Sequence, residues 1–424
     1  PPTISKQQID AVIALFSNSN FQEAIDNASK LMEEFHESSI LQNITGACYA
    51  GLGEQLTAVE CYKKAIAINP EYAKAHFNLG GIYFEMEKFQ DSIESYDRSL
   101  EIDSNNSEAH YYIANSFKKN GSSDFAIKSY KKALEISPSF IEALYGLGFL
   151  YQELGELDEA VNLYQKVIEI NPNLAEVHNK AGECFEVLGR LKDALLAFQK
   201  AVDINPVYSE AYNNLGNTFK ATGQLDNAIK SYKKALDISP DYPALHNNLG
   251  ITYKALGNLK DAVKSYLKGL ALNPGYIDIL NNLGVAYNEI GEMDEAIKSL
   301  KKAIAIKPGY AEAFNNLGAV YNKLGQPEKA IQSFERALKI NPDFPDPYNN
   351  LTVSYRKQGL FDNVSKSSKK AIELMINVIA TNPNDSETFY NLGLAYFEID
   401  SLEKSVESFE AAVSINPGLD EAYF

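Results

Sequence analysis

The stretch from Asn69 to Phe89 reads NPEYAKAHFNLGGIYFEMEKF, and close copies of it return along the chain. The copy that starts at Ser239 reads SPDYPALHNNLGITYKALGNL, and the one that starts at Lys307 reads KPGYAEAFNNLGAVYNKLGQP. The proline of each opening NP or SP pair recurs every 34 residues, apart from one double step and one step of 41, at Pro70, Pro138, Pro172, Pro206, Pro240, Pro274, Pro308, Pro342, Pro383 and Pro417. A fixed period of this length predicts a repeat array.

Small residues recur at fixed places of each 34-residue unit. The eighth place is Gly in most units, with Ala114 and Thr352 as departures, and the twentieth and twenty-seventh places are mostly Ala or Ser. A Gly at the fifteenth place, such as Gly257, divides each unit into two apolar-periodic halves of three to four helical turns. Because Gly readily takes the left-handed conformation that ends a helix, and Pro ends the second half, each unit is expected to form a closely packed helical hairpin.

A single hairpin cannot bury its own apolar face, so neighbouring hairpins must stack into a continuous core. The pattern resembles the tetratricopeptide repeat (TPR), over about eleven full units from Ser39 to about Leu419. The resemblance implies an all-α fold, a right-handed TPR α-solenoid, with first helices on the concave wall and second helices on the convex one.

The register of the repeats divides the chain into four segments. We expect a degenerate N-terminal helical repeat at residues 1–38, nine regular 34-residue units at 39–342, a divergent repeat with a seven-residue insertion at 343–385, and a last full repeat with the start of another at 386–424. Seven residues make nearly two helical turns, so the second helix of the divergent repeat can lengthen without rotating its apolar face. The insertion is either a tolerated enlargement of the convex side or a docking knob.

Composition narrows the class of partner. The chain of 424 residues is 45% hydrophobic and 22% charged, with a net charge of −17, so it is expected to fold and to avoid nucleic acid and anionic membranes. No apolar stretch reaches the length of a membrane-spanning helix, and a cytoplasmic location is expected. Cys48 and Cys61 could meet between neighbouring helices, although buried free thiols are the favoured interpretation for them and for Cys184.

Residue patterns typical of enzymes are absent from the sequence. It contains no nucleophile elbow, phosphate-binding loop, dinucleotide fingerprint or zinc-protease motif, and its histidines are not at metal-ligand spacing. Four of the five histidines share the fourth place of their units, which is expected to be a packing position. The sequence therefore predicts a protein that is not an enzyme and that needs no cofactor.

Asparagine is the polar residue that the repeats share. It occupies the sixth place, which the pattern puts on the groove side of the first helix, as Asn78, Asn214, Asn248, Asn282, Asn316, Asn350 and Asn391. Asn is a mediocre helix former, yet its short amide carries two donors and an acceptor that can pair with a peptide main chain. Either the row is a ladder for an extended peptide, or it is repeat consensus that was copied by duplication and is merely hydrated.

The row is similar to the asparagine ladder in the TPR superhelix of O-GlcNAc transferases, and this resemblance implies a grip on the backbone of a bound chain. Basic residues at the twelfth and thirteenth places predict a locally basic channel, namely Lys220, Lys254, Lys323, Arg356 and Lys357. Aromatic residues in the first part of the groove either form a pocket for apolar side chains or fill the groove, namely Phe77, Phe84, Tyr111, Tyr112, Tyr145 and Phe149.

Three functions remain open at this point. The first is a protein–protein interaction scaffold that binds an extended peptide or partner segment in its concave groove. The second is the substrate-recruiting arm of a larger enzyme of glycosyltransferase or sulfotransferase type, which the unfinished unit DEAYF at residues 420–424 suggests. The third is a structural protein that associates end to end with further copies of itself.

Overall fold

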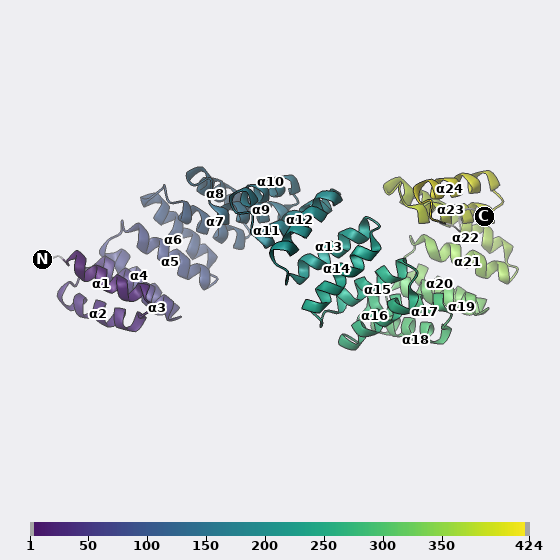
Figure 1. Cartoon of the computed structure of the whole chain (residues 1–424), viewed down its shortest axis with the longest axis horizontal. Coiled ribbons are helices and arrows are strands. Elements are labelled where there is room, and N and C mark those ends of the chain that lie inside the picture. Colours follow the sequence, from purple (N-terminus) through teal and green to yellow (C-terminus); the bar gives the residue numbers. More distant parts are fainter. Residues whose placement is uncertain (1–3, 420–424) are drawn as a thin grey trace. The chain divides into compact units, whose positions relative to one another are not determined.

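The computed structural model describes residues 4–419, which form 24 helices and no strand (Figure 1). The contacts between residues divide the chain into two compact units, residues 1–206 (unit 1) and 207–424 (unit 2). The unfinished repeat predicted at 420–424 lies outside the described residues. The prediction of an all-α repeat fold is confirmed.

Unit 1 consists of successive helix pairs, the first of which is the predicted degenerate repeat. Its helices are α1 (Lys6–Ser17), α2 (Phe21–Glu34), α3 (Ser39–Gly51), α4 (Gln55–Ile68), α5 (Ala73–Glu85), α6 (Phe89–Ile102), α7 (Ser107–Lys119), α8 (Ser123–Ile136), α9 (Ile141–Leu154), α10 (Leu157–Ile170), α11 (Ala175–Val187) and α12 (Leu191–Ile204).

Unit 2 continues the same alternation of a first and a second helix. Its helices are α13 (Ser209–Ala221), α14 (Leu225–Ile238), α15 (Pro243–Ala255), α16 (Leu259–Leu272), α17 (Ile277–Ile290), α18 (Met293–Ile306), α19 (Ala311–Lys323), α20 (Pro327–Ile340), α21 (Pro345–Lys357), α22 (Phe361–Thr381), α23 (Ser386–Glu398) and α24 (Leu402–Ile415).

The turn inside each hairpin needs a residue in the left-handed conformation. The fifteenth-place glycines all have positive φ, between 69° at Gly325 and 99° at Gly291. Where the fifteenth place is not Gly, the same conformation is taken by Ser19, Glu87 and Asp400, with φ near 60°. The predicted glycine caps are therefore confirmed. The turn keeps the same geometry where a residue other than Gly adopts the less favourable left-handed conformation.

The two helices of a hairpin approach closely because an eighth-place Gly faces a large side chain sixteen residues later. A Cβ atom added to Gly250 would lie 2.4 Å from the Tyr266 ring, and one added to Gly318 would lie 2.5 Å from the Phe334 ring. Tyr266 and Phe334 are fully buried. The small residue thus makes room for the ring that fills the hairpin.

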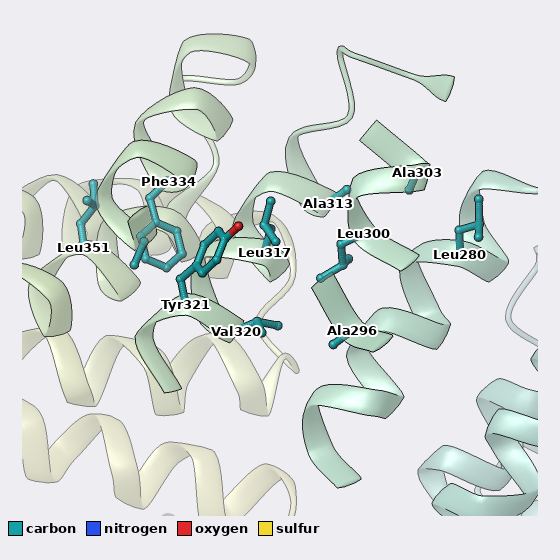
Figure 2. Packing of buried hydrophobic residues seen from close by; sticks show 11 residues of the cluster. Leu280, Ala296, Leu300, Ala303, Ala313, Leu317, Val320, Tyr321, Phe334 and Leu351 are labelled. Carbon is teal, nitrogen blue, oxygen red and sulfur yellow. The ribbon is translucent and has the colours of Figure 1, made fainter. Parts of the chain in front are cut away.

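Neighbouring hairpins share these rings in one core. In unit 2 the buried cluster that contains Phe334 extends from α17 to α21, and Figure 2 shows Leu351 and Tyr321 beside the Phe334 ring. First helices of successive repeats also contact one another, as α15 does α17 and α17 does α19. The first helices therefore line the inner side of the stack in unit 2, and the same contacts link α1, α3, α5, α7 and α9 in unit 1.

The divergent repeat differs from the others in two linked ways. Its second helix, α22, has 21 residues where the other second helices have 14, so the predicted lengthening is confirmed. At its eighth place Thr352 stands where most repeats have Gly, and Ser368 stands where most have an aromatic ring. Both are buried, so a larger eighth-place residue occurs together with a smaller one sixteen residues later.

The cysteines and the helix lengths add two further results. Cys48, Cys61 and Cys184 are free and buried, and burial raises the pKa of the Cys48 and Cys184 thiols to about 11.

No helix among residues 4–419 combines the length and the apolar character that crossing a membrane requires.

Candidate functional site: the asparagine row of unit 2

The sixth-place asparagines of unit 2 lie on the first helices, on the side that these helices turn toward the inner face. Their neighbours at the seventh and eighth places, such as Leu283 and Gly284, are buried in the core. The asparagines themselves are only half-buried. The helix therefore divides cleanly into a core stripe and a groove stripe, as the spacing predicts.

Four asparagines of the row bond to an asparagine of the preceding repeat. The Nδ2 of each donates a hydrogen bond to the fifth-place Oδ1 one repeat earlier, over 3.1 Å for Asn248 to Asn213, 3.0 Å for Asn282 to Asn247, and 2.9 Å for both Asn316 to Asn281 and Asn350 to Asn315. In unit 1, Asn78 donates to Asn43 over 2.9 Å in the same way. These bonds link neighbouring first helices and give the repeated asparagine a structural role.

The inter-repeat bond changes what the row can offer a ligand. The sequence-based interpretation assumed a free amide, whereas one N–H of each bonded amide is already used. Within residues 4–419 the Oδ1 atoms of Asn282, Asn316 and Asn350 accept no hydrogen bond, and they are not buried. Because the bond holds the amide, each rung presents one acceptor and one remaining N–H in a fixed orientation.

The two ends of the row differ from its middle. At the first end, Asn214 accepts a 3.4 Å bond from Asn213. At the other end the insertion lengthens the spacing, and Asn349 Nδ2 donates to the main-chain oxygen of Asn391 over 3.4 Å, not to its amide. The regular geometry thus spans four of the seven predicted residues, Asn248 to Asn350, while Asn78 is a single equivalent rung in unit 1.

Two of the five residues of the predicted basic channel are paired with carboxylates, and two others donate to main-chain oxygens. Lys254 forms a 3.0 Å ion pair with Glu289, and Arg356 forms one with Glu398. Lys323 and Lys357 each donate to a main-chain carbonyl of the preceding first helix, over 2.6 and 2.8 Å. Among the described residues only the Lys220 side chain of this set has no ion pair or hydrogen bond, and the basic channel stays a prediction.

An acidic row was missed in the sequence. The second places of the first helices carry Glu210, Asp278, Glu312, Asp346 and Glu387. Since the second place opens each helix and the twelfth place ends it, carboxylates line one edge of the row and cations the other, as helix dipoles favour. These acidic residues could have been recognised from the sequence, because the second place lies on the same groove stripe as the sixth.

Asp346 belongs to this acidic row, and the pKa of its carboxyl is shifted. Burial, together with the charges of Glu387 and Asp385, raises the pKa of its carboxyl above the usual value. The folded chain therefore holds this proton more tightly than the unfolded chain does. The penalty for ionising Asp346 is absent below the ordinary Asp pKa, near 4, and reaches its full size once the pH exceeds the raised value.

We expect Asp346→Asn to stabilise unit 2 at pH 7 and to change its stability little at pH 3.5, because the variant removes only the ionisation penalty. Urea unfolding of both proteins at the two pH values measures this. Glu312→Gln is the matched control, since it removes a carboxylate from the same helical position of the preceding repeat. A gain that is equal at both pH values would contradict the assignment.

Repeat models match most of the chain. A model described as TPR repeat matches residues 48–86, 124–155, 187–223, 216–257, 252–291 and 286–325. Two models described as tetratricopeptide repeat match residues 73–106, 141–174, 311–344 and 386–419. Among curated relatives, human tetratricopeptide repeat protein 6 is 32% identical over 82 residues, which span 19% of this chain and 15% of that protein.

Solved structures with similar repeats cover different shares of the chain. The MamA protein is 33% identical with a TM-score of 0.36, over 41% of this chain and 94% of its own. YrrB, described as a TPR protein with an unusual peptide-binding site, is 25% identical with a TM-score of 0.38, over 43% and 95%. Yeast Tom70 is 16% identical with a TM-score of 0.49, over 98% and 93%.

Proposed function

Since the chain belongs to the tetratricopeptide repeat family, we propose that it is a non-enzymatic binding scaffold whose unit 2 holds an extended protein segment by its main chain. The observation that carries this proposal is the repetition of one amide geometry at four consecutive repeats. Asn248, Asn282, Asn316 and Asn350 each use one N–H for the preceding repeat. Asn282, Asn316 and Asn350 each keep an acceptor and a donor for a ligand, whereas the Nδ2 of Asn248 also donates to Asn217 over 3.5 Å.

The chemistry of these rungs suits a main chain better than particular side chains. An extended segment offers alternating N–H and C=O groups, which match an Oδ1 acceptor beside an N–H donor. Each such bond contributes about 0.5–1.5 kcal/mol net. Four rungs, less the cost of ordering the segment, correspond to a dissociation constant on the order of micromolar.

The charged edges of the row add selectivity to this proposal. Lys220 has no intramolecular charge partner among the described residues, so an acidic side chain of the segment is expected to meet it first. Lys254 and Arg356 take part through exchange with Glu289 and Glu398. Exchange costs little for the Lys254–Glu289 pair, which is exposed on both sides, because surface pairs contribute only about 0–1 kcal/mol.

Replacing Asn248, Asn282 and Asn316 by Ala together should weaken binding of an extended peptide more than tenfold, because three rungs lose both groups that face the ligand. The probe is the strongest-binding peptide that the whole chain selects from a phage-displayed random 12-residue library. Fluorescence anisotropy with the labelled synthetic peptide gives the dissociation constant, and circular dichroism checks helicity.

The matched control replaces Asn213, Asn247 and Asn281 by Ala. These residues are the acceptors of the same three inter-repeat bonds. This variant breaks the bonds between repeats but leaves the sixth-place amides on the inner face. It should lower the free energy of unfolding about as much as the first variant while weakening the peptide far less. Equal loss of binding in both variants would mean that the asparagines serve stability alone.

A further inference from the structure

A cavity of about 750 Å³ lies on the first helices α5, α7 and α9 of unit 1. Aromatic side chains from all three helices line it, namely Phe84, Tyr111, Tyr145 and Phe149. Each of these rings is only half-buried, although such rings usually reach the core. Four of the six aromatic residues noted in the sequence thus line a hollow, whereas Phe77 and Tyr112 are not among its lining residues.

At the cavity an asparagine rung is replaced by other residues. The fifth place of one repeat and the sixth place of the next carry Asn43 and Asn78 at an ordinary rung, but Tyr111 and Gly146 here. Gly146 has no side chain to fill the place of the amide. A Cβ atom added there would lie 3.0 Å from the ring of Tyr130, which therefore forms the floor.

The charges around the cavity cancel one another. Lys118 lies 4.0 Å from the centre of the Phe149 ring and forms a 2.9 Å ion pair with Glu153. Lys119 and Glu142 add one further charge of each sign to the lining. A charged ligand group would meet a like charge here, whereas an apolar group would contact rings on several sides.

We propose that this cavity receives one large apolar side chain, Phe, Tyr or Leu, from an extended protein segment bound along the first helices of unit 1. The inference rests on the proposed function, because it supplies a side-chain contact for the same kind of ligand. Acidic residues outnumber basic ones in residues 1–206, so Lys or Arg is expected on either side of the apolar residue in that segment.

The chain itself suggests a substitution that places a polar side chain in the cavity. Three repeats later, Asn248 occupies the place of Gly146 above Tyr232, whose hydroxyl donates to Asn217 over 2.7 Å. Tyr130 donates to Asn115 in the same manner above the cavity floor. Gly146→Asn therefore introduces the residue that stands at this place three repeats later, with Tyr111 where Asn213 accepts the bond from Asn248, and it replaces a poor helix former.

The test selects phage-displayed random 12-residue peptides on the whole wild-type chain and, separately, on Gly146→Asn. Peptides selected by the wild type should share one position rich in Phe, Tyr or Leu beside Lys or Arg. The synthetic consensus peptide should bind Gly146→Asn at least tenfold more weakly, because burial of its apolar side chain is lost. Changing that residue to Ala in the peptide should weaken wild-type binding equally and leave the variant's binding unchanged.

Unaltered affinity for Gly146→Asn, with unchanged helicity, overturns the proposal, and so does a wild-type selection without an enriched apolar position. The triple variant of Asn248, Asn282 and Asn316 separates this result from the proposed function. If the triple variant loses its peptide while Gly146→Asn keeps the consensus peptide, the cavity is no subsite although the asparagine row binds. If only Gly146→Asn loses binding, the cavity is a subsite and the row is not.

Discussion

Phe334→Ala should lower the free energy of unfolding of unit 2 by about 3–5 kcal/mol, since it removes a fully buried ring from the centre of a repeat. The ring lies between two hairpins, where Leu317 and Leu351 pack beside it (Figure 2). The backbone around it is set by the close approach at Gly318, so the cavity left by the ring cannot collapse easily.

Hydrogen exchange in increasing urea is the suitable measurement, because stability in a repeat array is a sum of local terms. Amides of α19, α20 and α21 should lose protection at lower urea in the variant than in the wild type. Phe361→Ala is the matched control on the next second helix, since Phe361 is 70% exposed. Its cost should stay below about 0.5 kcal/mol, and equal costs for the two variants would refute the packing argument.

The fold follows from the sequence because its signals are local. The 34-residue period, the fifteenth-place glycines and the closing prolines each act within a few residues, so hairpin boundaries can be read directly. Even the insertion was readable, since seven residues preserve the phase of an apolar face. Local rules of this kind suffice for the helices and for the side that each one buries.

The candidate site depended on contacts between repeats, which a local pattern does not reveal. Lys254 with Glu289 and Asn282 with Asn247 are each 35 residues apart, one period plus one residue. After the insertion the same relation becomes 42, as for Asn349 with Asn391. With this rule the asparagine pairs could have been found in the sequence, because NN recurs in five consecutive units.

Gly318→Thr should destabilise the same repeat by about 2–3 kcal/mol, because its new side chain would overlap the Phe334 ring. A Cβ atom alone would stand 2.5 Å from that ring. The divergent repeat suggests how the conflict can be avoided, since it has Thr352 at the eighth place and Ser368 sixteen residues later, and both are buried. The eighth and twenty-fourth places are therefore expected to be coupled through their combined volume.

Adding Phe334→Ser to Gly318→Thr tests this coupling in a double-mutant cycle. The double variant should cost about 1–3 kcal/mol less than the sum of the two single variants, because the serine vacates the space that the threonine needs. Gly309→Thr is the control for the Gly-to-Thr change itself, since no atom lies within 4 Å of an added Cβ at Gly309. Strictly additive costs would show that the two places do not share one volume, and that Thr352 and Ser368 came together for another reason.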